Sequence, residues 1–379
     1  MRLKTLALCL MAGWGASASA QDSTQTLQQA LKQIPQGVLA APEAMQVFFV
    51  DVQVWRRLEQ AGPSADGMRR LSFAQWIGPL QSIGYGLDPW SASAKIPFDE
   101  LSYFAGFGRA PGNVTYWGLK DRQAANKFVD RLKQADFATV NGEVAGLIAN
   151  GEANKPDMTK AGGRDPWRGT MGNASFVLPL DAALVQASAA TGMQALGQPK
   201  PSVADSEIVA ASIAGLKEAV PAGDGRIVQA AIISPVLGLQ AVDPSKVISS
   251  APGEDMETAK QKLKALAESS GRGIPAYFAG VIADAQITDV PAVVISLSYA
   301  ECSTAKQAVD GLGAAWKQSM ASAVQAEVSG RTVQAGKLCA AVVSVTAPKA
   351  ENVGNPILAQ IMNRYMQRDF TVLQIGSQR

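Results

Sequence analysis

Short apolar runs typical of strands alternate along this chain with longer segments in which apolar residues recur every three or four positions. Met45–Asp51 (MQVFFVD) and Val290–Tyr299 (VPAVVISLSY) are predicted strands, since both are rich in β-branched and aromatic residues. Asp121–Ala135 and Ser303–Met320 are predicted helices, because their apolar residues fall on one helical face. Mixed signals of this kind favour an α+β protein.

The tetrapeptide YFAG occurs twice, at Tyr103–Gly106 and at Tyr277–Gly280. The features that flank it recur in the same order in both places: an apolar strand, an amphipathic helix and then a hairpin. The first hairpin turns at Asn141–Gly142, and a longer ribbon begins at Ser329–Gly330. This collinear order predicts an internal duplication.

The predicted order of elements in the first copy is β-α-β-β-α-β, which is the order of a ferredoxin-like unit with an antiparallel sheet. We therefore expect two tandem ferredoxin-like modules, at residues 45–172 and 173–379, after an N-terminal helical segment at 21–44. The boundary is placed in the Gly/Pro/Arg-rich stretch Ala161–Asn173. The second module has longer helices, one of them at 255–270, and ends in a helix and a strand.

The first twenty residues have the composition of a secretory signal peptide. Arg2 and Lys4 make a basic start, an apolar run too short to span a membrane follows, and Ala18–Ala20 is the small-residue pattern of a cleavage site. We expect cleavage after Ala20 and a periplasmic or extracellular protein. No later stretch is long and apolar enough for a membrane helix, so membrane insertion is not expected.

The amino-acid composition excludes several kinds of catalytic and binding site. The 379 residues include no histidine, which excludes Ser-His-Asp and Cys-His catalysis and imidazole metal sites. The chain has 34 basic and 32 acidic residues, and Arg2 and Lys4 lie in the signal segment, so the mature chain is formally neutral. A neutral chain without a basic run argues against nucleic acid as a partner. No metal site and no cofactor are predicted.

Two cysteines remain after cleavage, Cys302 and Cys339. In an oxidising compartment such a pair is expected to form a disulfide, and the alternative is two free thiols. The bridge would join the start of the second module's helix to the strand after it. No C-x-x-C motif supports a redox role.

Ser303 and Lys306 form an S-x-x-K pattern at a predicted helix start, which is where penicillin-binding proteins and class A β-lactamases place their nucleophile. The further motifs of that chemistry, an S-x-N loop and a downstream K-T-G strand, are missing. The simpler interpretation is that Ser303 caps the helix.

The candidate binding residues are aromatic and basic residues of the first module. Trp90 and Trp167 stand beside prolines in loop-like sequence and could line an exposed groove. Arg164 and Arg168 lie in the glycine-rich stretch GGRDPWRG, where backbone N–H groups could approach an anion. The alternatives are that the tryptophans belong to the core and that the loop is only a turn.

The stretches GLDPW and APGNVTYWG, within residues 80–150, resemble uncharacterised secreted and lipoprotein-like proteins of bacteria. The resemblance implies no activity. The N-terminus departs from the lipoprotein pattern, because bulky Leu8 precedes Cys9.

The leading hypothesis is an exported, non-enzymatic binding or scaffolding protein of the periplasm or cell envelope, with an envelope protein, a peptide or a glycan as its partner. One alternative is a hydrolase or transferase that uses Ser303 or a carboxylate pair. Another is a small-ligand binder with its site between the two modules.

Overall fold

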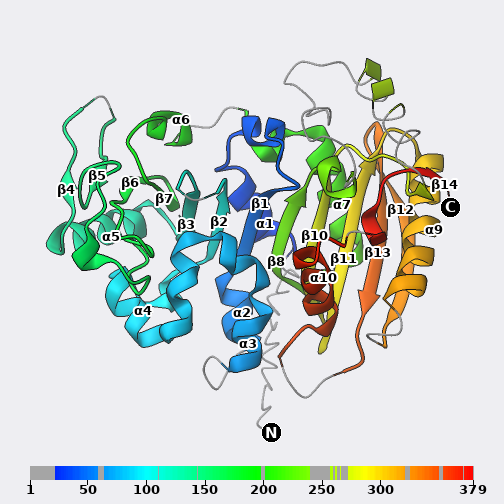
Figure 1. Cartoon of the computed structure of the whole chain (residues 1–379), viewed down its shortest axis with the longest axis horizontal. Coiled ribbons are helices and arrows are strands. Elements are labelled where there is room, and N and C mark those ends of the chain that lie inside the picture. Colours follow the sequence, from blue (N-terminus) through cyan, green and yellow to red (C-terminus); the bar gives the residue numbers. More distant parts are fainter. Residues whose placement is uncertain are drawn as a thin grey trace, which may run out of the picture.

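One antiparallel sheet of twelve strands organises the described part of the chain, as the computed structural model shows (Figure 1). The strand order is β12-β13-β11-β10-β8-β1-β2-β3-β7-β6-β5-β4. The structure describes residues 22–58, 64–109, 111–142, 144–197, 201–239, 257, 258, 261, 262, 265, 272–320, 325–349, 353–369 and 371–378. The predicted signal peptide at 1–20 and most of the helix predicted at 255–270 lie outside these residues.

The sheet is built from strands of two to ten residues. They are β1 (Met45–Asp51), β2 (Tyr103–Phe107), β3 (Val114–Gly118), β4 (Ala138–Thr139), β5 (Ile148–Ala149), β6 (Phe176–Pro179), β7 (Ala183–Ala187), β8 (Gly225–Ile233), β10 (Gly280–Ile287), β11 (Val290–Tyr299), β12 (Glu327–Ala335) and β13 (Leu338–Thr346). A separate parallel pair joins β9 (Arg272–Gly273) to β14 (Ser377–Gln378).

Helices cover both faces of the sheet. The described α-helices are α1 (Gln25–Leu31), α2 (Val52–Leu58), α3 (Ala65–Arg70), α4 (Leu87–Ala94), α5 (Arg122–Gln134), α6 (Met193–Gly197), α7 (Glu207–Ala219), α9 (Cys302–Ser319) and α10 (Pro356–Met366). Between α3 and α4 the chain forms two 3-10 helices, η2 (Ser72–Trp76) and η3 (Gly78–Tyr85).

The prediction of an α+β protein with antiparallel sheets is confirmed, but the tandem ferredoxin-like modules are wrong. A ferredoxin-like unit interleaves its strands, whereas β1, β2 and β3 are consecutive neighbours here, and so are β8, β10 and β11. The boundary predicted at 172/173 falls between β5 and β6, which pair directly with each other. The long connection from β1 to β2 returns the chain beside the strand that it left, and short turns then place β3 next to β2 and β11 next to β10.

The two halves of the sheet nevertheless follow a similar path. The first half runs from β1 through β2 and β3 to the helix α5, and it returns to the sheet as β7, which pairs with β3. The second half runs from β8 through β10 and β11 to the helix α9, and it returns as β13, which pairs with β11. The two YFAG segments lie at matching places, in β2 beside β1 and at the start of β10 beside β8.

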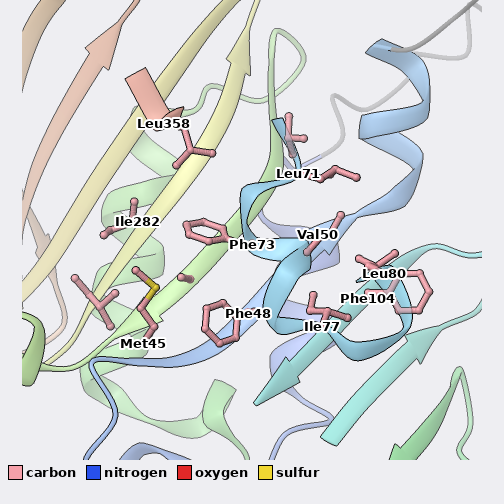
Figure 2. Close-up of a cluster of buried hydrophobic side chains, with 14 of the residues drawn as sticks. Met45, Phe48, Val50, Leu71, Phe73, Ile77, Leu80, Phe104, Ile282 and Leu358 are labelled. Carbon is pink, nitrogen blue, oxygen red and sulfur yellow. The ribbon is translucent and has the colours of Figure 1, made fainter. Parts of the chain in front are cut away.

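Side chains of the central strands alternate between two hydrophobic layers. Phe48 and Val50 of β1 point to the layer beneath α2, α5, α9 and α10, which Figure 2 shows in part. Val47 and Phe49 point to the layer beneath α1 and α7. Because both layers are covered, β1 is buried along its whole length and shows no polar alternation in the sequence.

A buried ion pair lies in the first layer. Arg70, at the end of α3, donates to both carboxylate oxygens of Asp284 in β10, at distances of 2.7 and 2.9 Å. Both side chains are fully buried. Gln229 of β8 and Asn355 also donate to the Asp284 carboxylate, and Gln286 accepts from the Arg70 guanidinium.

This network fixes the segments around it. The Asn355 Oδ1 accepts from the backbone N–H groups of Ile357 and Leu358, which caps the N-terminus of α10. The Gln229 Oε1 accepts from the backbone N–H of Phe73, which holds η2 against the sheet. The register shifts opposite Asp284, where Val228 of β8 is an extra residue, and this irregularity bends β8 locally. The network therefore sets the positions of α3, η2 and α10 on the sheet.

Asp284→Ala is expected to destabilise the protein by about 3 to 5 kcal/mol, because it leaves the Arg70 charge buried without a partner. The double substitution Arg70→Met with Asp284→Leu should recover much of this loss, since it removes both charges. Urea unfolding followed by circular dichroism measures the difference.

Lys306→Ala serves as the control, because it breaks the exposed Lys306–Asp310 pair and should cost less than about 1 kcal/mol. An Asp284→Ala protein as stable as this control would contradict the structural importance of the network.

Candidate functional site

The tryptophans of the first half form an aromatic cluster around Trp117 of β3. The ring of Trp167 stacks on Trp117 with centroids 4.3 Å apart, and Trp90 of α4 lies 5.7 Å away on the same ring. Phe128 of α5 packs against both Trp117 and Trp167. The cluster fastens α4, α5 and the 165–168 loop to the sheet.

Trp90 and Trp167 are therefore core residues, and the prediction that they could line an exposed groove is wrong for Trp90, which is fully buried. Only 3% of Trp167 is exposed. Each indole N–H donates to a backbone carbonyl, from Trp90 to Pro79 and from Trp167 to Ala94. The prediction of loop sequence is confirmed for Trp167 but is wrong for Trp90, since Pro89 and Trp90 lie in the first turn of α4.

Arg164 and Arg168 lie four residues apart and have different surroundings. The Arg164 guanidinium lies over the Tyr85 ring at 5.2 Å and is exposed. The Arg168 side chain is only 4% exposed and donates to the Asp136 carboxylate at 2.7 Å and to the Asn150 carbonyl. The glycine-rich loop thus buries one cation and leaves the other on the surface.

The ion pair affects the acidity of Asp136. Burial opposes ionisation of this carboxyl, but hydrogen bonds from Arg168 and Lys160 outweigh it and hold the Asp136 pKa below its usual value. Burial raises the pKa of the neighbouring Asp165, whose carboxylate accepts from the backbone N–H of Trp167. Arg168 is therefore already matched by negative charge.

A cavity of about 340 Å³, which we call the polar cleft, opens beside this loop. It is bounded by the start of η3, by the ends of β3 and β7, and by the loop that carries Arg168. Its lining contains side-chain amides, hydroxyls and one cation, and no carboxylate: Gly78, Pro79, Gln81, Pro111, Asn113, Thr115, Pro166, Trp167, Arg168, Gly169, Thr170, Met171, Asn173, Ala174, Ser175, Gln186, Ala187 and Ser188.

Some lining groups are fixed and others are available. The Gln186 side chain accepts from the Trp117 indole and donates to Ser175, which anchors one wall. The Arg168 Nε and the Nδ2 of the adjacent Asn150 have no hydrogen-bond partner in the described structure, but both atoms are buried and are not open to a ligand in the cleft. The amides of Asn113 and Asn173 make no hydrogen bond to the residues that the structure describes. The cleft thus offers donors to a ligand that carries acceptors.

Sequence reasoning singled out two residues of this site, Trp167 and Arg168, and missed the rest. The missed residues Asn113, Asn173 and Gln186 come from different segments, and 73 residues separate Asn113 from Gln186. No local spacing connects them, because the pairing of β3 with β7 brings them together.

Ser303 is exposed and is the second residue of α9, whose N-cap is Glu301, so the predicted cap is misplaced by two residues. The Lys306 Nζ donates to Asp310 at 3.0 Å. Among the residues that the structure describes, none hydrogen-bonds to the Ser303 hydroxyl. A serine without a base to accept its proton is not an activated nucleophile.

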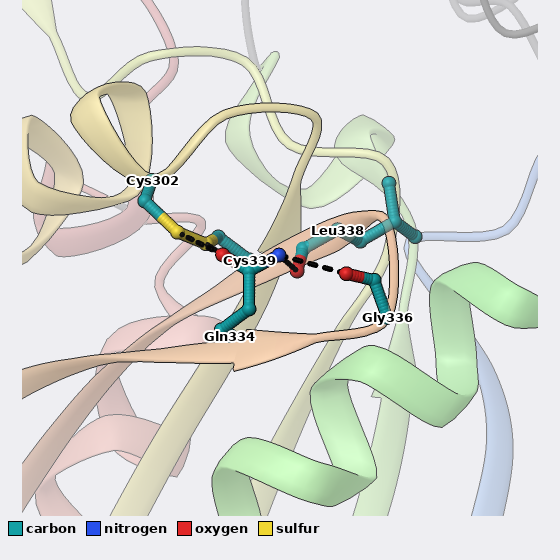
Figure 3. The surroundings of a disulfide bond; sticks show 5 residues. All are labelled: Cys302, Gln334, Gly336, Leu338 and Cys339. Carbon is teal, nitrogen blue, oxygen red and sulfur yellow. Dashed lines mark hydrogen bonds between the residues drawn. A yellow bond between two sulfur atoms is a disulfide. The ribbon is translucent and has the colours of Figure 1, made fainter.

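Cys302 and Cys339 form the predicted disulfide, which joins the first residue of α9 to β13 (Figure 3). Gln334 of β12 lies against the bridge, with its Oε1 2.9 Å from the Cys302 sulfur. Its amide nitrogen donates to the carbonyls of Gly336 and Leu338 across the hairpin. The bridge and Gln334 together hold α9, β12 and β13 at one edge of the sheet.

No described helix has the length and hydropathy needed to cross a membrane. No group of three or more acidic or cysteine side chains with metal-binding geometry occurs among the described residues.

Comparison with known proteins gives little further information. The chain matches no family profile and no curated protein. A solved structure described as "Structure of crystal form IV of TP0453" matches with a TM-score of 0.32 and 10% identity, over 86% of this chain and 96% of that one. A likeness this distant supports no inference about activity or partners.

Replacing both Cys302 and Cys339 by serine should lower the stability by about 3 to 4 kcal/mol, since the bridge closes a loop of 37 residues. Thermal unfolding with and without reductant checks this. Reductant should lower the melting temperature of the wild type and leave that of the double variant unchanged. Equal melting temperatures for all four samples would contradict it.

Asp136→Asn should make the free energy of unfolding depend less on pH in the acid range. A carboxyl with a depressed folded-state pKa contributes stability above its unfolded pKa of about 3.9, and this contribution is lost as the pH falls through the lower folded value. The variant should therefore be less stable than the wild type near neutral pH, with a difference that shrinks in strong acid. Urea unfolding across this range measures the difference, and a gap independent of pH would contradict the assignment.

Proposed function

We propose that this chain is an exported, non-enzymatic binding protein of the periplasm or cell envelope, and that the polar cleft is its ligand site. The signal-like N-terminus, the disulfide and the resemblance of residues 80–150 to secreted bacterial proteins support export. The observation that carries the binding proposal is the cleft of about 340 Å³, whose lining contains side-chain amides, hydroxyls and Arg168 and no carboxylate.

The chemistry of the lining favours an uncharged ligand rich in hydrogen-bond acceptors. Asp136 already pairs with both Arg168 and Lys160, so an anion brought to Arg168 would be repelled by that carboxylate. A neutral carbonyl oxygen takes an N–H donor without this penalty. Side-chain amides such as Asn113 and Asn173 can both donate to and accept from a peptide group. We therefore propose a peptide segment as the ligand.

A glycan is the less favoured ligand. Sugar binding commonly uses the exposed face of an aromatic ring, and the one aromatic residue of the lining, Trp167, stacks on Trp117 and is almost fully buried. The hydrolase alternative has less support, because Ser303 lacks a base among the described residues and neither Asp136 nor Asp165 lines the cleft.

The similar paths of the two halves of the sheet support an origin by duplication of a strand–strand–strand–helix–hairpin unit. In this proposal the first half acquired the polar cleft and the tryptophan cluster. The second half acquired the disulfide.

The double substitution Asn113→Ala with Asn173→Ala should abolish ligand retention without destabilising the fold. Neither side-chain amide makes a hydrogen bond to the residues that the structure describes. Each lost hydrogen bond is worth about 0.5 to 1.5 kcal/mol, so affinity should fall about tenfold or more. Native mass spectrometry of protein recovered from the envelope fraction without reductant measures retention. Gln307→Trp, on the exposed face of α9, is the control and should retain the ligand.

A second measurement covers weak ligands. Amide hydrogen exchange of the loop at 166–175 should slow when the purified protein is returned to an envelope extract, and should not slow in the double variant. A bare wild-type chain whose exchange is also unchanged by the extract would contradict the proposal. A bound glycan would retain the site and overturn the assignment to peptide.

A further inference from the structure

The two edges of the twelve-stranded sheet differ in length. At one edge, β4 has two residues. At the other edge, β12 has nine residues and runs in unbroken register with β13, without a bulge. Within the described part of the chain no strand pairs with the outer side of β12 (Figure 1). Soluble proteins usually shorten, bend or interrupt their edge strands, because open backbone groups recruit other strands.

The hairpin geometry identifies the open backbone groups. Ala335 pairs with Leu338 across the two-residue turn of Gly336 and Lys337, and Gly336 has a φ of +62°. The residue pair that closes such a turn exchanges backbone hydrogen bonds. Non-hydrogen-bonded and hydrogen-bonded pairs then alternate along the hairpin. The N–H and C=O groups of Val328, Gly330 and Thr332 therefore point away from β13.

The side chains on the two faces of β12 also differ. A Cβ on Gly330 would meet Val309 of α9, so this position faces α9. Arg331 faces the other side, where its guanidinium reaches the Glu218 carbonyl at the end of α7. Glu327 shares this face with Arg331, because the two are four residues apart in the strand. Both side chains are exposed.

Charge complementarity selects one way for two such edges to pair. In an antiparallel pair of β12 strands centred on Ser329, Glu327 of each copy lies opposite Arg331 of the other, which gives two ion pairs related by the dyad. The same register pairs Val328 with Gly330 through their open backbone groups. A pair centred on Arg331 would instead place two arginines opposite each other.

We propose that β12 is a dimerisation edge, at which a second copy of this chain pairs antiparallel with its own β12, centred on Ser329. The dimer joins two sheets into one continuous sheet and covers the long open edge of each. The short β4 edge cannot offer a comparable strand, so the contact is symmetric and closes at two copies.

The test is sedimentation velocity of the mature, oxidised protein at concentrations up to about 100 μM. Glu327→Arg and Arg331→Glu each place like charges opposite one another at two positions, and each should weaken the dimer about tenfold or more. The double reversal restores opposite charges and should return the dissociation constant to within about threefold of the wild type. Circular dichroism melting of each variant confirms that the monomer fold is intact.

Lys337→Glu, at the tip of the same hairpin, is the matched control and should leave the dimer unchanged. A wild-type monomer at the highest concentration would overturn the proposal. A dimer that both single reversals leave intact would also overturn it. A dimer weakened by Lys337→Glu and not by the reversals would overturn the Ser329-centred register, because a pair centred on Thr332 places Glu327 opposite Lys337.

Discussion

The buried pairing of Arg70 with Asp284 is the constraint on which the arrangement of the first layer depends. Two charges removed from water lose several kcal/mol of solvation each, and a single ion pair rarely recovers this. Here Gln229 and Asn355 add donors to the carboxylate, while Gln286 and backbone carbonyls accept from the guanidinium. The charges are tolerated only when all of these segments are in place, so the network favours one packing of α3, η2 and α10 over the alternatives.

The sheet is covered on both faces because the central strands carry apolar side chains on both sides, and these must be removed from water. The strand β13 (LCAAVVSVT) is apolar except for Ser344 and Thr346, because α9 packs on one side and α7 on the other. Small residues allow the close approach, and a Cβ on Gly215 of α7 would meet Val342 of β13 at 2.7 Å. The similar path of the two halves keeps one helix, α5 or α9, at the same step in each half, so the first layer is continuous across the centre of the sheet.

The sequence was informative where the cause of a structure is local. The helical spacing of apolar residues in α5 and α9, the alternation of strands and helices, and the cysteine pair all led to correct predictions. Topology was missed because β-strand pairing is decided by contacts between distant segments. No local pattern connects Arg70 with Asp284, which are 214 residues apart. The burial of Trp90 was missed for the same reason, since the rings that enclose it include Phe104 of β2 and Trp117 of β3.

The polar cleft and the β12 edge lie in opposite halves of the sheet, and this separation has a physical consequence. The Trp117 cluster rigidifies one wall of the cleft, so a ligand bound there meets a largely preformed surface and loses little entropy in ordering it. The disulfide and Gln334 similarly fix the hairpin that carries the free edge. The cleft lies away from the β12 edge, so pairing at that edge leaves the cleft of each copy open. The proposed dimer would present two copies of the proposed ligand site, whose combined avidity for a repetitive partner would exceed the affinity of either site alone.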